Sequence, residues 1–216
     1  GAIGVQAADA AFGIDLTALD VYGNVLSFGV NTFSGTVAIS DTTTTIIPAV
    51  SGAFVAGVRA ESVQVTQSVA GDVITVVSGG RSGVSNAFNV VAGVLDHFTY
   101  TVQPVGPYLA GQGIGVRVEA RDVYDNLKVG YTQGVVVSDS TGTVSEGSAG
   151  SGDTVIAFNG GVYNAGLAAS LYITKAQGGI QLTVTDGGVS TLSNAFTVEP
   201  AVLHHFGVGA IGGQVA

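Results

Sequence analysis

Cysteine, methionine and tryptophan are absent from this chain of 216 residues, and only 10% of its side chains are charged. Without cysteine there is no disulfide and no thiolate chemistry, which leaves the redox compartment open. Six basic and 15 acidic residues give a formal net charge of −9, the wrong sign for covering a phosphate backbone. No run of about 18 apolar residues is present. We therefore expect neither a nucleic-acid partner nor a membrane span in this segment.

Glycine, by contrast, is abundant, with 34 residues against 4 prolines, and 46% of the residues are hydrophobic. Together with many Val, Thr, Ile and Ser residues, this composition is typical of short strands separated by turns. No stretch has a sustained helical period. The sequence therefore predicts an all-β fold, and the length allows one large core or two cores of about 100 residues each.

A junction motif occurs twice and favours two cores. Residues 85–90 (SNAFNV) recur as 193–198 (SNAFTV), and residues 95–98 (LDHF) recur as 203–206 (LHHF), at one common shift (193 − 85 = 108 and 203 − 95 = 108). A whole unit and its connection to the next unit are thus repeated. Repeats of this kind decide the architecture before any single element does.

Within each unit, alternating apolar and polar residues predict strands, first at residues 12–20 and 114–121. Each is followed by one turn motif, DVYGN at 20–24 and DVYDN at 122–126, in which Asp and Asn side chains can bond nearby backbone groups. Further strands are expected at 33–40, 62–66 and 74–78, with residues 54–58 aligned to 163–167. About seven strands in roughly 100 residues is the rhythm of an immunoglobulin-like (Ig-like) sandwich.

The chain therefore divides into tandem immunoglobulin-like β-sandwich domains. We expect residues 1–92 to form an Ig-like sandwich that lacks its first strand and residues 93–200 to form a complete one. Residues 201–216 are then the first strand of a following unit, or a donor strand to a neighbouring subunit.

The order of these motifs resembles a known group of proteins. A DVYGN turn after the first core strand, a Gly-Thr-Val strand at 35–37 and the closing GVSNAFNV at 83–90 are similar to tandem bacterial Ig-like repeats of cell-surface proteins. That group includes the invasin and intimin proteins. The same order is, more distantly, similar to the filamin repeats. The resemblance implies a secreted, extracellular or cell-surface stalk, fibre or adhesin. With neither cysteine nor tryptophan, Phe, Tyr and Val must fill the core.

The two ends of the chain resemble each other. Residues 209–216 match residues 1–8 at six of eight positions (209 − 1 = 208, two units). Two explanations fit: a longer tandem array whose partners lie in cis, or subunits that join head to tail through residues 203–208. Either way, assembly contacts are expected at both ends of the chain, at Leu203, His205, Phe206 and Val208 and at Gly1 and Ile3.

Candidate chemistry is sparse. Oxygen atoms for Ca²⁺ are offered by two groups, Asp20 with Asn24 and Asp122 with Asp125 and Asn126. Each group has too few carboxylates for a calcium cage by itself, which favours a purely structural turn. No other cofactor is expected.

Three histidines, His97, His204 and His205, lie at the unit junctions without a further ligand at fixed spacing, which favours packing or solvent exposure over metal binding. No GxSxG motif occurs, and the glycine pairs lie between strands instead of before a helix. We expect no enzyme activity.

The sequence thus favours a structural subunit or segment of an extracellular filament, fibre or stalk, whose partners are copies of itself or neighbouring repeats. The alternative is an adhesin whose loops at 42–48 and 141–153 bind host or matrix glycans or a protein. An accessory domain of a secreted enzyme is a third interpretation.

Overall fold

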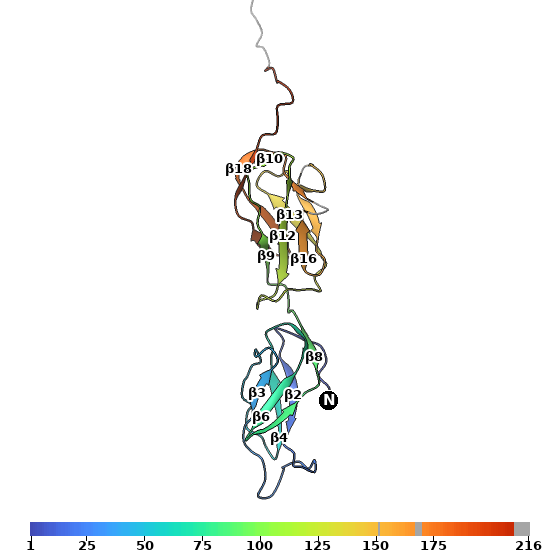
Figure 1. Cartoon of the computed structure of the whole chain (residues 1–216), viewed down its shortest axis with the longest axis vertical. Helices are drawn as coiled ribbons and strands as arrows, with labels where there is room; N and C mark the ends of the chain where they lie inside the picture. The colour runs from blue at the N-terminus through green and yellow to red at the C-terminus, as the bar shows by residue number, and fades with distance from the viewer. Residues whose placement is uncertain (151, 167–169, 210–216) are drawn as a thin grey trace, which may run out of the picture.

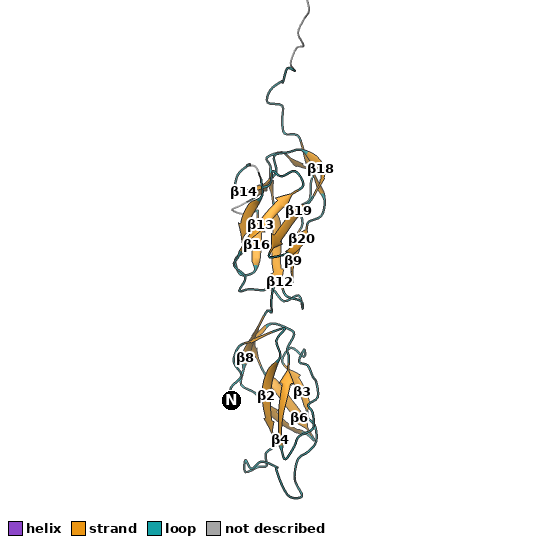
Figure 2. Cartoon of the chain, turned by 180° about the vertical axis from the view of Figure 1, so that it is seen from behind, coloured by secondary structure: helices purple, strands orange, loops and turns teal. Residues whose placement is uncertain are grey.

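The structure, a computed structural model, describes residues 1–150, 152–166 and 170–209, and within them the only regular elements are β-strands. The all-β prediction is confirmed. Strands β1 to β8 lie in one group and strands β9 to β21 in a second group further along the long axis of the molecule (Figure 1; Figure 2). No helix long and apolar enough to cross a membrane occurs in the described residues.

The first group is an incomplete sandwich. One sheet holds only β2 and β4; the facing sheet has the order β3-β6-β7, and a small third sheet has the order β1-β8-β5. The strand bounds are β1 Gln6–Ala7, β2 Phe12–Thr17, β3 Ala38–Asp41, β4 Val58–Val63, β5 Val69–Asp72, β6 Ile74–Ser78, β7 Arg81–Val84 and β8 Phe88–Val91.

The second group repeats this plan with additional strands, among them β9, which has no counterpart in the described part of the first group. Its main sheets have the orders β16-β12-β9 and β15-β13-β19-β20, and its smaller sheets have the orders β10-β21-β18 and β11-β17-β14. The bounds are β9 His97–Val102, β10 Tyr108–Leu109, β11 Gly113–Ile114, β12 Val116–Arg121, β13 Gly134–Asp139, β14 Ser145–Glu146, β15 Thr154–Ala157, β16 Val162–Ala165, β17 Leu171–Tyr172, β18 Gln177–Ile180, β19 Leu182–Asp186, β20 Val189–Leu192 and β21 Phe196–Glu199.

Buried apolar side chains form two separate clusters, one in each group. The first includes Ile14, Phe54 and Val63, and the second includes Phe98 and Val118. Equivalent positions pair in the same way: Gln6 lies opposite Val90 in a parallel pair, as Tyr108 lies opposite Val198. Burial alternates along β3, β8 and β21, so one face of each of these strands lies in its cluster and the other in solvent.

The alignment of residues 54–58 with 163–167 is wrong. Ala18 N donates to Gly57 O at 2.8 Å, whereas Ala120 N donates to Gly161 O at 2.9 Å, so Gly57 corresponds to Gly161. Phe54 is therefore the counterpart of Phe158, not of Tyr163. The expected strands at 33–40 and 131–138 also begin later, at β3 and β13. Sequence similarity alone did not reveal the difference in loop length between the two units.

In both sandwiches, an aspartate, buried in the first and half-buried in the second, organises the loop after the first strand of the facing sheet. The carboxylate of Asp41 accepts hydrogen bonds from the backbone N–H of Thr43 at 3.0 Å, Thr45 at 2.7 Å and Ile46 at 2.9 Å. Asp139 accepts three equivalent bonds from its own loop. These polar loops are thus held to the core by one charged acceptor each.

Replacing Asp41 with alanine should lower the free energy of unfolding of the first sandwich by about 3 kcal/mol, because several backbone donors lose a charged acceptor. Urea unfolding measures this. Asp15→Ala is the matched control, since Asp15 is exposed on β2, and it should shift stability by about 0.5 kcal/mol at most. Equal losses of unfolding free energy in the two variants would contradict the role of Asp41 as the acceptor that holds this loop.

Candidate assembly interface

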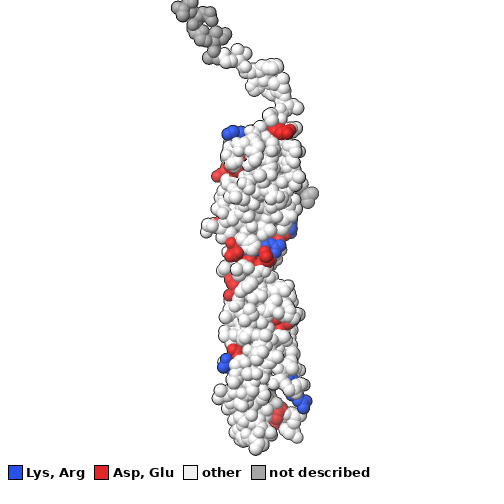
Figure 3. All heavy atoms as spheres, turned by 90° about the vertical axis from the view of Figure 1, so that its left-hand side faces the viewer, with Lys and Arg blue, Asp and Glu red and all other residues white. Residues whose placement is uncertain are grey.

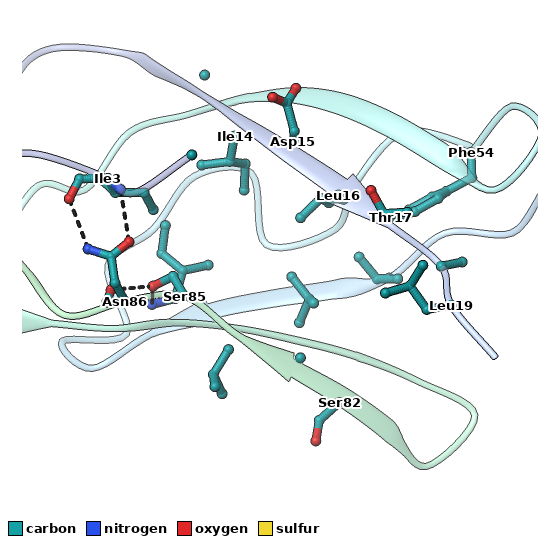
Figure 4. A pocket seen from close by; sticks show the side chains of 18 of the residues that line it. Ile3, Ile14, Asp15, Leu16, Thr17, Leu19, Phe54, Ser82, Ser85 and Asn86 are labelled. Atoms are coloured by element: carbon teal, nitrogen blue, oxygen red, sulfur yellow. Dashed lines mark hydrogen bonds between the residues drawn. The ribbon is translucent and has the colours of Figure 1, made fainter. Parts of the chain in front are cut away.

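The first sandwich carries an open groove with a volume of about 860 Å³. The groove lies between β2, which contributes Ile14 and Leu16, and β7, which contributes residues 82–84 (Figure 4). Phe33 and Phe54 line it as well. Its lining is thus largely the apolar interior of the sandwich, opened along one side.

In the second sandwich, β9 occupies the corresponding place. It pairs antiparallel with β12, which is the counterpart of β2, and it lies against β20, which is the counterpart of β7. Two side chains of β9 point into the core, Phe98 at 3% and Tyr100 at 8% exposure. Under this cover Val118 is fully buried, whereas its counterpart Leu16 is only partly buried. The groove therefore lies at the place that β9 occupies in the second sandwich.

An aromatic pair marks one part of this site. The rings of Phe33 and Phe54 meet edge to face with centroids 5.0 Å apart. Their counterparts Tyr131 and Phe158 make a similar contact at 5.3 Å, and Phe98 of β9 lies 5.9 Å and 5.5 Å from these two rings. The first sandwich thus presents the same aromatic contact surface for an incoming Phe side chain.

Gly1 and Ile3, which sequence reasoning placed among the assembly residues, line this groove. Ile3 N donates to Asn86 Oδ1 at 2.8 Å, and Asn86 Nδ2 donates to Ile3 O at 2.9 Å (Figure 4). The N-terminal segment is thereby fixed at the rim, and the asparagine of the repeated SNAF motif is what fixes it.

The other assembly residues lie in a C-terminal tail, residues 201–209, that forms no strand. The tail leaves the end of the second sandwich that faces away from the first (Figure 1). Leu203 and His205 are exposed, as are Phe206 at 85% and Val208 at 89%. The structure does not bring these residues to Gly1 and Ile3 within one chain. The predicted match of residues 209–216 to 1–8 falls mostly on residues 210–216, outside the described part.

The two Asp-x-Tyr-x-Asn turns have the same internal geometry. Asp20 Oδ1 accepts from Tyr22 N and Asn24 N, both at 2.8 Å, and Asn24 Nδ2 donates to Asp20 Oδ2 at 2.9 Å. Asp122 makes the equivalent three bonds at 2.9 Å each. The hydrogen bond from the Asn24 side chain, followed by backbone N–H donors, lowers the pKa of Asp20.

The second turn does more than reverse the chain, because it joins the two sandwiches. Ser68 N donates to Asn126 Oδ1 at 2.9 Å, and Asn126 Nδ2 donates to Thr66 O at 2.8 Å. Gln64 Nε2 donates to the Tyr124 hydroxyl at 2.8 Å. We call these contacts the internal junction. Sequence reasoning missed this role, although the repetition of the same Asp, Tyr and Asn was the available signal.

The linker is held at the same place. Gly93 N donates to Asp122 Oδ2 at 2.8 Å, and Val94 N donates to Asp9 Oδ2 at 3.2 Å. Lys128 Nζ donates to Gly93 O. Charged side chains gather where the two sandwiches meet, while much of the remaining surface on this face is uncharged (Figure 3). The linker is therefore fixed on both sides instead of being a free hinge.

The calcium candidates are only partly brought together. The carboxylates of Asp20 and Asp122 already accept backbone and Asn side-chain donors, and Asp125 instead approaches His97, with Oδ1 3.2 Å from Nε2. In the described residues, no group of three His, Asp or Glu side chains has the geometry to hold a metal ion. The observed role of both turns is hydrogen bonding.

The three junction histidines are not gathered into one site. His97 lies between two carboxylates: its Nδ1 is 2.9 Å from Asp96 Oδ2, and its Nε2 is 3.2 Å from Asp125 Oδ1. His204 and His205 contact each other, with their Nδ1 atoms 3.2 Å apart, in the exposed tail.

The loop at residues 42–48 uses its threonines internally. Thr43 Oγ1 lies 2.7 Å from Thr45 Oγ1, and the latter accepts hydrogen bonds from Thr66 N at 3.3 Å and Gln67 N at 3.2 Å. The loop at 141–153, described except for residue 151, behaves alike: Thr143 Oγ1 accepts from Thr174 N at 3.2 Å. Both loops thus support the neighbouring loop that follows β4 or β17.

No protein-family model matches the chain, and no curated protein matches it. Several solved structures align with it. An adhesin of Escherichia coli, FdeC, has 16% identity over 92% of this chain and 62% of its own, with a TM-score of 0.47. Titin domains Z1Z2, in a complex with telethonin, give 12% identity over 93% of both chains and a TM-score of 0.29. The extracellular domains 3–5 of Drosophila OTK give 9% identity over 93% of this chain and 63% of their own, with a TM-score of 0.28.

The chain spans about 62% of the length of the adhesin chain. The Ig-like architecture itself follows from the strand pairing described above. Membership of the invasin and intimin group stays a prediction.

The internal junction should respond to acid at one identifiable bond. Burial by itself would raise the pKa of Asp122, but hydrogen bonds from Asn126, Gly93 and Tyr124 outweigh this and lower the pKa below the ordinary 3.8. A lowered folded-state pKa means that the stabilisation is present above the unfolded value and is lost as the pH falls through the folded one. The amide proton shift of Gly93, followed by NMR, should titrate with a midpoint below 3.8.

The control for this titration is Asp122→Asn, which should abolish it. A Gly93 midpoint at or above 3.8 would show that the bond to Asp122 is not the one that holds the linker.

Proposed function

We propose that this chain is a structural subunit or segment of an extracellular filament, fibre or stalk, in which residues 203–209 of one copy fill the groove of the next copy. One observation carries the proposal. The tail has apolar residues, Phe206 and Val208, at the positions of the inward-pointing residues of β9, and the groove lies where β9 covers the second sandwich. The groove and the tail are complementary parts of one sandwich.

The register follows from the second sandwich. There Phe98 lies opposite Ala120 and Tyr100 opposite Val118. With the 108-residue shift of the tail and the 102-residue shift of the turn motif (206 − 98 = 108; 122 − 20 = 102), Phe206 lies opposite Ala18 and Val208 opposite Leu16. Phe206 then packs on Phe33 and Phe54.

The energetics favour such pairing. Phe206 and Val208 are exposed in the tail, and burying each contributes about 1.5–3 kcal/mol. The free edge of β2 gains backbone hydrogen bonds of the kind that β12 makes with β9. Ordering of the tail and loss of subunit freedom oppose this gain. The groove, with its apolar side chains and the aromatic pair Phe33 and Phe54, still offers a specific packing site for Phe206.

The arrangement propagates because donor and acceptor lie at different ends of the molecule. A head-to-tail contact that does not close by rotation generates a linear assembly. The same contact serves a longer array, in which a preceding unit supplies the strand in cis. In this proposal, the function of the chain resides in the length of the assembly and in its end-to-end contacts. An extracellular location is part of the proposal.

Engineered cysteines test the register, and the absence of native cysteine makes the result clean. Two variants are mixed, one carrying Thr17→Cys and the other Gly207→Cys. These positions are the counterparts of Glu119 and Thr99, which lie opposite each other. We expect a disulfide-linked dimer under oxidising conditions, because directly opposed Cα atoms are about 5 Å apart, within disulfide reach.

The matched control replaces Thr17→Cys by Asp15→Cys, two residues away on the same face of β2. It should cross-link poorly, since the separation then exceeds the disulfide range. Equal cross-linking of both pairs, or none in either, would overturn the proposed register.

A second test asks whether burial of Phe206 drives assembly. Phe206→Asp should shift the chain from multimers to monomers in light scattering after size exclusion, because a carboxylate cannot enter the apolar groove. Val155→Asp is the control, since Val155 is exposed on β15, away from the groove and the tail, and it should leave the multimers intact. Multimers that persist in Phe206→Asp would refute the filament proposal.

The adhesin alternative receives no support of its own from the contacts seen. The loops at 42–48 and 141–153 engage their threonine hydroxyls within the fold. Glycan binding therefore stays a prediction from the sequence.

A further inference from the structure

The internal junction supplies a template for a second junction. Its central contact is made by Asn126, which accepts from Ser68 N and donates to Thr66 O. Each side of this contact occurs once more in the chain. The turn at 20–24 is the counterpart of the turn at 122–126, and the loop at 172–176 is the counterpart of the loop at 64–68.

These two counterparts lie at opposite ends of the molecule. The turn at 20–24 belongs to the end of the first sandwich that faces away from the second (Figure 1). The loop at 172–176 follows β17, whose chain neighbour β18 lies near the point where the tail leaves the second sandwich (Figure 1). Tyr22 is 87% exposed at its end, compared with 43% for Tyr124 in the internal junction.

Both counterparts already have the geometry that they adopt when docked. The three hydrogen bonds that shape the turn around Asp20 are 2.8, 2.8 and 2.9 Å long, and the three equivalent bonds around Asp122 are each 2.9 Å long. The two sets therefore agree within 0.1 Å. On the loop side, Thr45 Oγ1 holds Thr66 N at 3.3 Å, as Thr143 Oγ1 holds Thr174 N at 3.2 Å. Preformed partners lose little conformational freedom on binding.

A third position shows a compensating exchange of side chains. In the internal junction, a Cβ atom on Gly93 would lie 2.5 Å from Asp9 Cγ, so a side chain at this linker position requires the Asp9 carboxylate to move. Its counterpart in the tail is Ala201, which carries that Cβ (201 − 93 = 108). The counterpart of Asp9 is Gly111, at the same place in an equivalent turn: Ala10 N donates to Ala7 O, and Gln112 N to Leu109 O. A methyl group gained at residue 201 thus accompanies a side chain lost at residue 111, at the two counterpart positions.

We propose that the turn at residues 20–24 of one copy docks on the loop at residues 172–176 of the copy whose tail fills its groove. This inference rests on the proposed function and adds a second interface to it. Asn24 Oδ1 accepts from Ala176 N, Asn24 Nδ2 donates to Thr174 O, and Asp20 Oδ2 accepts from Ala201 N. The partner is a second copy of this chain, recognised end to end.

The junction between copies is not identical to the internal one. Lys128, which donates to Gly93 O, has Leu26 as its counterpart, and Asp9 has Gly111. Two linker contacts are therefore missing. The junction between copies therefore bends more easily than the internal junction. Along a filament, stiffer joints within copies alternate with more compliant joints between copies.

Hydrogen exchange on chains of 216 residues tests the docking. The dimer formed by the Thr17→Cys and Gly207→Cys chains is compared with the Phe206→Asp chain, which should stay monomeric, and exchange is followed at the amide of Ala176. We expect exchange of this amide to slow about tenfold in the dimer, since a hydrogen-bonded amide exchanges only by local opening. The amide of Ser68, held by Asn126, should be protected in every sample.

Asn24→Ala, introduced into the Thr17→Cys chain, should abolish the protection at Ala176 while the cross-link still forms. The surviving cross-link shows that the variant folds and receives the tail. The matched variant Asn126→Ala should do the reverse, exposing Ser68 and leaving Ala176 protected.

The outcomes separate the two proposals. A cross-link with no protection at Ala176, or with protection that Asn24→Ala leaves unchanged, overturns the docking and retains the strand exchange. Absence of the cross-link overturns both.

Discussion

The rest of the structure depends on how each sandwich covers the open side of its core. In the second sandwich β9 provides that cover: it pairs with β12 and buries Phe98 against Tyr131 and Phe158. This one strand supplies hydrogen-bond partners for the backbone of β12 and covers the apolar side chains of the core. In the first sandwich the described chain supplies no such strand, and the same two requirements remain at the edge of β2. This unmet requirement is what makes end-to-end assembly the favoured interpretation.

Stiffness along the chain comes from a small number of charged acceptors. Asp41 and Asp139 fix loops within a sandwich, whereas Asp122 fixes a turn and, through Gly93 N, the linker as well. A carboxylate that accepts several N–H donors is a strong and directional restraint. The chain thereby achieves ordered loops and a fixed joint without disulfides, and with only 10% charged residues.

The two units differ where their roles differ. The loop positions that contact another sandwich keep the Asp, Tyr and Asn of the turn, while positions on the two sides of the linker change in concert, as with Asp9 and Gly93 against Gly111 and Ala201. Coupled changes of this kind preserve the fit between neighbouring surfaces, since a methyl group gained on one side requires space on the other.

The sequence by itself determined the all-β class, the duplicated unit and the inward-facing residues of its strands, because a period of two and a repeated motif are local properties of the chain. It also predicts assembly contacts at Phe206 and Val208, from the repeat of residues 95–98 at 203–206. Only the tertiary structure decided that Phe54 corresponds to Phe158 and that Asn126 bridges to Thr66 and Ser68. Those facts depend on loop lengths and on contacts between residues about 60 positions apart, which no local pattern encodes.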